Sequence, residues 1–473
     1  MLFASFLVAA LTLTYVLGSN PNRGLGRFLA PDSMATIMLI AIFTIRPVFT
    51  NRFDEAAWYG LYLPDQAEES LALGVGMTCL VGLLLGVFLA RLRPTKLQAL
   101  ENRSAGPRSY DGWSFSRGKL VFATVAGLGA YIALLMAVAG ADVIRQLAGG
   151  RSSEVALAGV PEIVMMIPLA GSIAAAIFIL GAKDRQLVFF DLALIIGSTA
   201  ASILMVSQLG TRRFIIPAML LPVLAALIRK PVRVKAGHVI IGAVAILFLA
   251  IVPMVRAAGA RRVGENLATA SWRYLQEEGI GGVLRPVFAS YDTEMFDYIA
   301  VASRGLSGDQ YGLGRGTLLE FFTRPIPSFT RIGELTGVPF SDQMITRLFG
   351  GGCGEPFCPV ASVAGVLYFD GGFILVFLGS IAFGAGMRAI ANRWVYNRGL
   401  SPFQMFAVVS VSSFALVAAR TNTIHTMWWC IYTLIIGYAI IKVLNARRNA
   451  SIPAELQSRP GKEYDLTPGR TRT

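Results

Sequence analysis

Blocks of about 20 consecutive apolar residues recur along most of this 473-residue chain. A helix rises about 1.5 Å per residue, so a block of this length crosses the roughly 30 Å hydrocarbon core of a bilayer. Inside that core every backbone polar group must be paired within the chain, which leaves helices and closed barrels. A barrel would have segments of about ten residues with alternating polarity, whereas these runs are uninterrupted. The sequence therefore predicts an all-α polytopic membrane protein.

The composition agrees with this fold class, because 55% of the residues are hydrophobic and only 15% are charged, against about 25% charged in soluble proteins. The first apolar block lacks the basic start and the small-residue cleavage site of a signal peptide, so we interpret it as a span. We predict about eleven spans, near 2–18, 30–49, 71–90, 120–140, 160–182, 187–207, 214–228, 236–255, 372–390, 402–419 and 424–442.

The positive charge orients the predicted spans. A net charge of +14 would indicate nucleic acid on a soluble protein, but here the basic residues gather in the linkers 91–119 and 229–235 and in the C-terminal tail. Placing these three segments in the cytoplasm agrees with alternating spans, and all seven lysines then lie on that side. We therefore expect the N-terminus outside, the C-terminus inside, and no nucleic-acid partner.

This topology divides the chain into four parts: an N-terminal bundle of about eight spans, a large extracytoplasmic loop, the C-terminal spans, and a cytoplasmic tail expected to be disordered. Their bounds are 1–255, 256–371, 372–443 and 444–473. Within the loop, apolar residues recur at helical spacing over 265–278 and 291–304. The segment 360–369 is predicted to be a short helix at the outer interface, and Asp370-Gly371-Gly372 a break before the next span.

Arginines are the most informative residues on the predicted outer side. The planar guanidinium matches a phosphate group with two parallel hydrogen bonds and does not lose its charge. Several arginines that converge there would suit a lipid-linked pyrophosphate, although each alone can equally be a salt-bridge partner or a headgroup contact. The arginines on that side include Arg46, Arg212, Arg213, Arg324, Arg331 and Arg420.

Proton transfer requires an acid or a histidine near these arginines. The loop offers several acids, each of which is either a general base or a solvated charge; they include Asp292, Glu294, Asp297, Glu320 and Glu334. His425 lies in the short outer turn that begins at Arg420. It is either a proton-transfer residue or a polar residue at a helix start.

Two of the four cysteines, Cys353 and Cys358, flank a short outer loop with Gly and Pro between them. An oxidising compartment favours a disulfide there, and two free thiols are the alternative. Cys79 and Cys430 lie within predicted spans and are interpreted as packing residues. No Cys/His cluster has zinc spacing, and no Walker or Rossmann glycine pattern occurs, so we expect neither a metal nor a cofactor.

Two segments carry a family resemblance. The loop contains Phe321-Phe-Thr-Arg-Pro-Ile-Pro-Ser-Phe-Thr-Arg331, and the next span is entered by Pro359-Val-Ala-Ser-Val-Ala-Gly-Val-Leu-Tyr-Phe-Asp-Gly-Gly372. These stretches, with the Gly-Thr-Arg-Arg element at 210–213, resemble the O-antigen polymerase family over roughly residues 205–390. The chain departs from the family pattern at Val366, where members often carry Glu, and at Arg213, where they carry Gly.

The resemblance implies a glycosyltransferase in the bacterial plasma membrane that polymerises polysaccharide at the outer face. Such an enzyme moves a growing glycan from undecaprenyl pyrophosphate to another lipid-linked repeat unit, without a metal. It implies roles in pyrophosphate binding for Arg212, Arg213, Arg324, Arg331 and Arg420, in sugar binding or Arg orientation for Asp370, and as base for Asp292, Glu294 or His425. The partners implied are the lipid-linked oligosaccharide and membrane lipid; a chain-length regulator is left open.

Two alternatives remain at this point. An O-antigen ligase is related, but ligases tend to place a His motif in the large loop, and residues 256–358 contain no His. A lipid-linked oligosaccharide flippase or another transporter would favour internal repeats and charges at mid-membrane depth. The chain shows no internal repeat, and its expected midspan acid is Asp191.

Overall fold

The computed structural model describes residues 1–48, 65–91, 115–140, 162–182, 187–208, 212–230, 295–303, 311–325, 361–395 and 400–449, with short pieces between 232 and 279. Every regular element within these ranges is a helix, which confirms the all-α prediction. Eight of the described helical segments are long and apolar enough to cross a membrane. The chain therefore has the architecture of a multi-pass membrane protein.

The eight membrane-length segments match eight of the predicted spans. They comprise α1 (Leu2–Ser19), α3 (Pro31–Ile40) continued by the π-helical η1 (Ala41–Ile45), α5 (Gln66–Arg91), α7 (Arg117–Ala139), α10 (Glu162–Met166) continued by η2 (Ile167–Leu169) and α11 (Ala170–Gly181), α12 (Phe189–Gln208), α20 (Ser362–Val395) and α23 (Thr423–Asn449). The remaining helices are α2 (Leu25–Leu29), α13 (Arg212–Arg229), α16 (Met295–Ala302), the π-helical η4 (Arg315–Leu319), α17 (Glu320–Thr323), α21 (Pro402–Ser413) and α22 (Ala415–Arg420).

The other three predicted spans have different outcomes. The stretch 214–228 is helical in α13, but this helix has arginines at both ends and is not among the eight. The stretch 402–419 forms two short helices, α21 and α22, which meet at Phe414. Most of 236–255 lies outside the described residues. The predicted count of eleven spans therefore remains a prediction.

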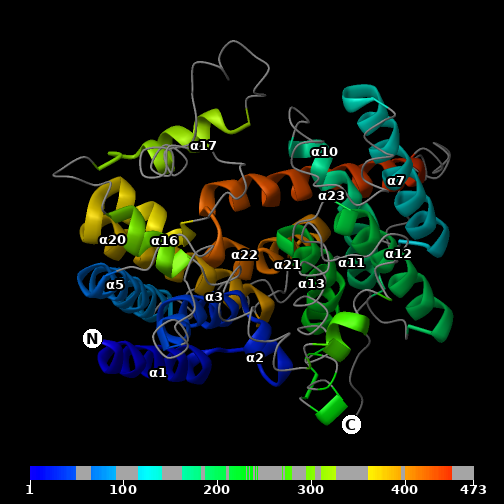
Figure 1. Ribbon diagram of the computed structural model, residues 1–473. Helices are drawn as coiled ribbons and strands as arrows, with labels where there is room; N and C mark the ends of the chain where they lie inside the picture. Colours follow the sequence, from blue (N-terminus) through cyan, green and yellow to red (C-terminus); the bar gives the residue numbers. More distant parts are fainter. Residues whose placement is uncertain are drawn as a thin grey trace, which may run out of the picture.

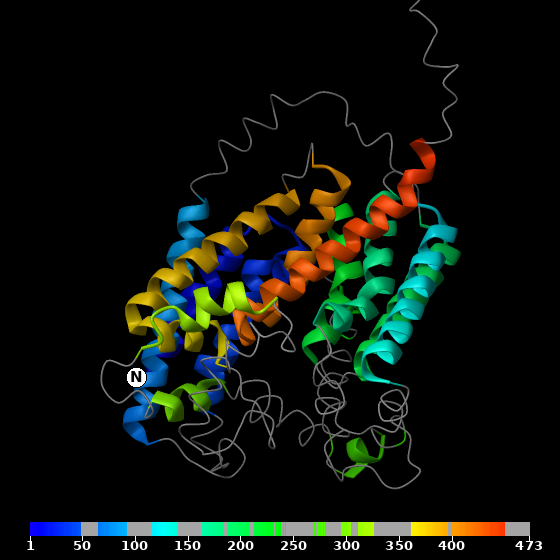
Figure 2. The ribbon, with the colours of Figure 1, turned by 90° about the horizontal axis from the view of Figure 1, so that it is seen from above.

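The helices pack as two groups that meet along α22. Figures 1 and 2 show α1, α5 and α20 on one side and α7, α11 and α12 on the other. One hydrophobic core is built from α1, α3, α5, α16 and α20, and the other mainly from α7, α11, α12, α13, α21 and α23. Helix α22 contacts α3 and α20 as well as α23, so the segment just before α23 lies at the junction of the groups.

The closest packing in the first group is between α5 and α20, and it depends on glycine. A Cβ atom added at Gly86 would lie 2.1 Å from the carbonyl oxygen of Ile381, and one added at Gly384 would lie 2.4 Å from that of Leu83. Small residues of this kind let two helix backbones touch, as is common within membranes. Cys79 is buried beside this contact, and its Sγ atom accepts a hydrogen bond from Ser380.

Helix α20 is kinked at the predicted break. Gly371 and Gly372 have non-helical backbone angles, and Gly372 has φ +62°, in the left-handed region that favours glycine. The ring of Tyr311 lies 3.1 Å from the place where a Cβ atom of Gly372 would be. The part before the kink is largely buried and contacts α16, so it is packed against other parts of the protein, and its expected position at the outer interface stays a prediction.

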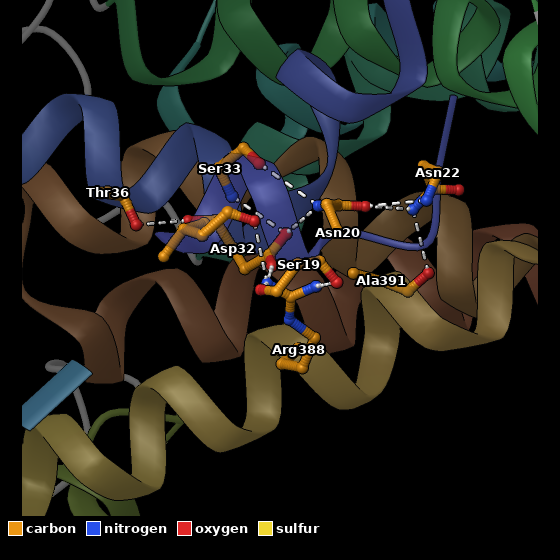
Figure 3. A network of polar contacts seen from close by, with 9 residues as sticks. Ser19, Asn20, Asn22, Asp32, Ser33, Thr36, Arg388 and Ala391 are labelled. Carbon is orange, nitrogen blue, oxygen red and sulfur yellow. Dashed lines mark hydrogen bonds and ion pairs between the residues drawn. The ribbon is translucent and has the colours of Figure 1, made fainter. Parts of the chain in front are cut away.

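A buried polar network joins the turn between α1 and α3 to the far end of α20 (Figure 3). The Nη2 atom of Arg388 lies 2.9 Å from Oδ2 of Asp32, and Oδ1 of Asp32 accepts a hydrogen bond from Asn20 at 3.0 Å. Arg388 also donates to the carbonyl oxygens of Val16 and Ser19. A buried charge is tolerated when it is paired and hydrogen-bonded, so this network fixes α20 against the start of the chain.

Contacts that charged side chains make with distant segments fall on the two predicted sides of the membrane. On the predicted outer side the pairs are Arg46–Asp297, Arg324–Glu162 and His425–Glu320. On the predicted inner side they are Arg117–Asp191, Arg229–Ala182 and Arg388–Ser19. Each pair joins residues that alternating spans place on the same side. Asp191, expected at midspan, lies in the first turn of α12 and pairs with Arg117.

Candidate active site at the predicted outer ends of the helices

The centre of the site is a contact between the large loop and the start of the last span. Glu320 begins α17 and is 6% exposed. Its Oε1 atom contacts Nε2 of His425, in the first turn of α23, and its Oε2 atom accepts a hydrogen bond from Nδ2 of Asn422 at 2.8 Å. Asn422 also accepts from the backbone N–H of Ile424 at 2.9 Å, as a residue capping the start of a helix does. Both carboxylate oxygens of Glu320 are therefore engaged.

These partners keep Glu320 ionised. Burial acts to raise the pKa of this carboxyl, but the hydrogen bond and charge of His425, the amide of Asn422 and the charge of Arg324 outweigh it, so the pKa lies below its usual value. An ionised carboxylate at Nε2 holds the imidazole in one orientation. It also favours the tautomer in which Nε2 carries the proton and Nδ1 the lone pair.

Arg324 places a positive charge beside this pair. It follows Glu320 by one helical turn, and its Nη2 atom lies 2.5 Å from Oε1 of Glu162, at the start of α10. The charges of Arg324 and Glu162 both act on His425. Within the described part of the chain, the Nε atom of Arg324 and the Oε2 atom of Glu162 are buried without a hydrogen-bond partner. Arg324 can therefore donate one further hydrogen bond, and Glu162 can accept one.

Aromatic rings line the same region. The indole Nε1 of Trp428 donates to the carbonyl oxygen of Phe321 at 2.9 Å, and the two rings have centroids 5.5 Å apart. Trp429 lies edge-on to His425 at 6.2 Å, and the guanidinium of Arg213 lies 5.4 Å from the centroid of the Trp429 ring. A cation over an aromatic face is attracted by the ring, so Arg213 is held against Trp429, the ring that lies edge-on to His425.

Asp370 approaches the site from the kink of α20. Its Oδ1 atom accepts a hydrogen bond from the backbone N–H of Gly316 at 2.8 Å, and Thr317 also bonds to it. Both residues belong to η4, which runs directly into Glu320. Asp370 therefore fixes the loop segment that presents Glu320 and Arg324, and its expected role in sugar binding or Arg orientation stays a prediction.

The structure brings together a part of the expected set. His425, Arg324 and Asp370 contact or adjoin the segment around Glu320. Arg213 lies against Trp429, and Arg420 ends α22 two residues before Asn422. Arg212 begins α13, but its side chain is outside the described residues. The same holds for Arg331, Asp292, Glu294, Cys353 and Cys358, so their predicted roles and the predicted disulfide stay predictions.

Sequence reasoning did not single out several residues of the site. Glu162 is an acid next to a proline at the start of an apolar span, and Asn422 is an amide before an apolar run; both match the pattern of a helix start. Trp428 and Trp429 are aromatic residues near the end of a span, where the membrane interface favours them. These signals indicate helix ends and membrane depth, and they do not indicate which residues meet. Glu320 is one of eleven acidic residues in 256–358, and no feature of the sequence distinguished it from the others.

The fold and the site together define an all-helical, multi-pass membrane protein with a partly buried polar site at one end of its helices. Within the described residues, no three His, Cys, Asp or Glu side chains are grouped so that they could hold a metal ion. No family model matches this chain, and comparison with curated proteins and with solved structures finds no match. A function for the site is therefore argued from its chemistry and from the motif resemblance.

Proposed function

We propose that this protein is a membrane glycosyltransferase of the O-antigen polymerase type, which extends a polysaccharide on undecaprenyl pyrophosphate at the outer face of the bacterial plasma membrane. The observation that carries the proposal is the contact of Glu320 with His425, with Arg324 one turn away. It joins an ionised carboxylate, an imidazole and a guanidinium at the end of the helices. Two of these three residues come from the loop that carries the resemblance.

In this proposal His425 is the general base. Glu320 occupies Nε2 of His425, which leaves Nδ1 as the atom that accepts a proton. Nδ1 takes the proton of the acceptor sugar hydroxyl while the hydroxyl oxygen attacks the anomeric carbon of the donor glycan. Glu320 stabilises the imidazolium that forms. A positioned base of this kind contributes about 10²–10⁴-fold to the rate.

The arginines act on the leaving group. The bond between the anomeric carbon and the phosphate oxygen breaks, and undecaprenyl pyrophosphate departs with an additional negative charge. Fixed cations next to that charge stabilise the transition state. The buried Nε atom of Arg324 has no hydrogen-bond partner among the described residues, and Arg213 is held against Trp429. A pyrophosphate that binds Arg324 competes with Glu162, so Glu162 serves as a placeholder in the absence of substrate.

The aromatic rings complete the site. A pyranose ring has an apolar face of C–H groups that packs on a flat aromatic ring, and Phe321, Trp428 and Trp429 supply such rings beside the charged residues. The combination of arginines, an acid–imidazole pair and tryptophans suits a substrate with both sugar and phosphate. A flippase needs no group that deprotonates a hydroxyl.

The test is the length distribution of lipid-linked glycans in cells that lack this gene and in cells complemented with His425→Ala, Glu320→Gln or wild-type protein. A polymerase predicts single repeat units that accumulate outside in the deletion strain and in both variants, and long chains with the wild type. Lys119→Ala, at the opposite end of the helices, is the control and should restore long chains. Full-length polymer stranded on the carrier indicates a ligase instead, single units trapped in the cytoplasm indicate a flippase, and an unchanged profile contradicts all three.

A further inference from the structure

The loop segment 311–325 is attached to the tops of two membrane-length helices. At one end the backbone N–H groups of Gly312 and Leu313 donate to the carbonyl oxygens of Phe369 and Asp370, at the kink of α20, at 2.8 and 2.9 Å. At the other end Glu320 contacts the first turn of α23. The segment therefore crosses from one helix to the other at the predicted outer end of both.

One side of this segment is apolar and exposed. Leu313, Leu318, Leu319 and Phe322 expose between 50% and 87% of their surface, while Glu320 between them is buried. A single exposed apolar side chain is ordinary on any protein. Four large ones within ten residues, on a segment whose charged carboxylate points inward, form an apolar face that is unfavourable in water.

The depth of the segment matches the edge of the hydrocarbon. Trp428, which donates to the carbonyl oxygen of Phe321, is the sixth residue of α23 and lies about 8 Å along the axis from its first residue, at 1.5 Å per residue. Glu320, next to Phe321, contacts Asn422 and His425 at the start of the same helix, so the segment lies level with the first two turns of α23, where tryptophan is enriched in membrane proteins.

Exposed apolar side chains also occur on the two neighbouring spans, close to the points where the segment is attached. Directly after the kink, Phe373 and Ile374 of α20 expose 44% and 75% of their surface, and Met427 of α23 exposes 43%. On membrane-length helices such residues face lipid. The points where 311–325 is attached, at Phe369 and Asp370 and at His425, precede these exposed residues by only a few positions in the chain.

From this geometry we infer that η4 and α17 form an interfacial segment, with Leu318, Leu319 and Phe322 inserted in the acyl-chain edge of the leaflet on the side of the His425 site. The occupant of the apolar face is bilayer lipid. An amphipathic segment that lies in the membrane plane buries its apolar face about 5–10 Å deep. The inference does not depend on the reaction proposed above, because it uses only the attachment, exposure and depth of the segment.

The test uses nitroxide labels at Leu318→Cys, Phe322→Cys and, as the matched control on the same segment, Arg315→Cys, in full-length protein in lipid nanodiscs with the four native cysteines replaced by serine. We expect labels at 318 and 322 to show an O₂-to-nickel-complex accessibility ratio severalfold above that at 315. Equal ratios at the three sites would mean that water covers the face, and shielding from both reagents would mean that another part of the chain covers it. Either result overturns the inference.

A second measurement keeps the native cysteines. A benzophenone side chain is introduced at position 322 or 315 of the otherwise native chain, and the protein is irradiated in vesicles of radiolabelled phospholipid. We expect lipid adducts from position 322 at severalfold the yield from position 315. Equal yields, or cross-links only within the chain, contradict insertion.

Discussion

Arg46 at the end of η1 and Asp297 in α16 form a buried ion pair, although 251 residues separate them in the sequence. The Nη2 and Nε atoms of Arg46 lie 2.6 and 3.0 Å from the same Oδ2 atom, and neither side chain is more than 2% exposed. The described side chains of α16 from Met295 to Ala300 are buried as well. This part of the large loop is thus a component of the packed core.

Removing one partner of this pair should strongly destabilise the protein. Asp297→Ala leaves the Arg46 charge buried without its carboxylate, which typically costs about 3–5 kcal/mol. The double substitution Arg46→Met with Asp297→Leu removes both charges and should cost less than either single change. The check is the thermal unfolding midpoint of purified protein in nanodiscs. A double variant that loses as much as the two single variants together contradicts the view that the uncompensated charge is the main cost.

The contact between α5 and α20 gives a second prediction. Gly86→Ala forces a Cβ atom to within 2.1 Å of the Ile381 carbonyl oxygen, so the helices must separate, and we expect a lower unfolding midpoint and less folded protein. Gly129→Ala on α7 is the matched control, because nothing lies within 4 Å of its added Cβ atom. Gly129→Ala should be neutral or should stabilise the protein by up to about 1 kcal/mol, since alanine favours the helix more than glycine does. If both variants lower the unfolding midpoint equally, the close approach of α5 and α20 is not the cause of the loss.

The sequence predicted the membrane architecture well for a physical reason. A span must have about 20 apolar residues whatever it packs against, so the signal is local and strong in segments such as 71–90 and 372–390. The break at Gly371 and Gly372 was also local, because two glycines interrupt an apolar run. The prediction was weak where tertiary contacts decide: the stretch 402–419 forms two helices that meet at Phe414, and no pattern marks that junction.

The site was predictable by residue type but not by pairing. The reasoning that selected His425, Arg213 and Arg324 used their chemistry and their predicted side of the membrane. The structure places His425 and Arg324 beside Glu320, and Arg213 against Trp429, whose ring lies next to His425. The pairs themselves are separated by 105 residues for Glu320–His425 and by 162 for Arg324–Glu162. Such contacts depend on how the loop folds over the helix ends, which neither periodicity nor spacing encodes.

The protonation of Glu320 should make the stability of the folded protein decrease at low pH. Its pKa in the folded protein lies below the usual 4.5 because His425, Asn422 and Arg324 favour the carboxylate more than burial disfavours it. A carboxyl group whose pKa is lower in the folded protein than in the unfolded chain stabilises the fold. This stabilisation is fully present at a pH above the pKa of the unfolded chain, and it is lost as the pH falls through the pKa of the folded protein. The unfolding midpoint of the wild type should therefore fall more steeply below pH 4.5 than that of Glu320→Gln. Parallel curves for the two proteins would contradict this assignment.

Activity should depend on His425 and Glu320 as a unit. If His425 is the base, His425→Ala should slow glycan transfer by about 10²–10⁴-fold. Glu320→Gln keeps the size of the side chain but removes the charge that orients and stabilises the imidazole, so we expect a large loss here as well, with rates compared at equal amounts of folded protein in the membrane.

The double variant His425→Ala with Glu320→Gln separates a joint role from two independent ones. Groups that act together show strongly non-additive losses, so the double variant should be about as slow as His425→Ala alone. The measurement is the rate of chain extension on purified lipid-linked repeat units in nanodiscs, with Lys119→Ala as the control for handling and reconstitution. If the losses of the single variants multiply in the double variant, Glu320 does not act through His425, and its contact with the imidazole serves folding alone.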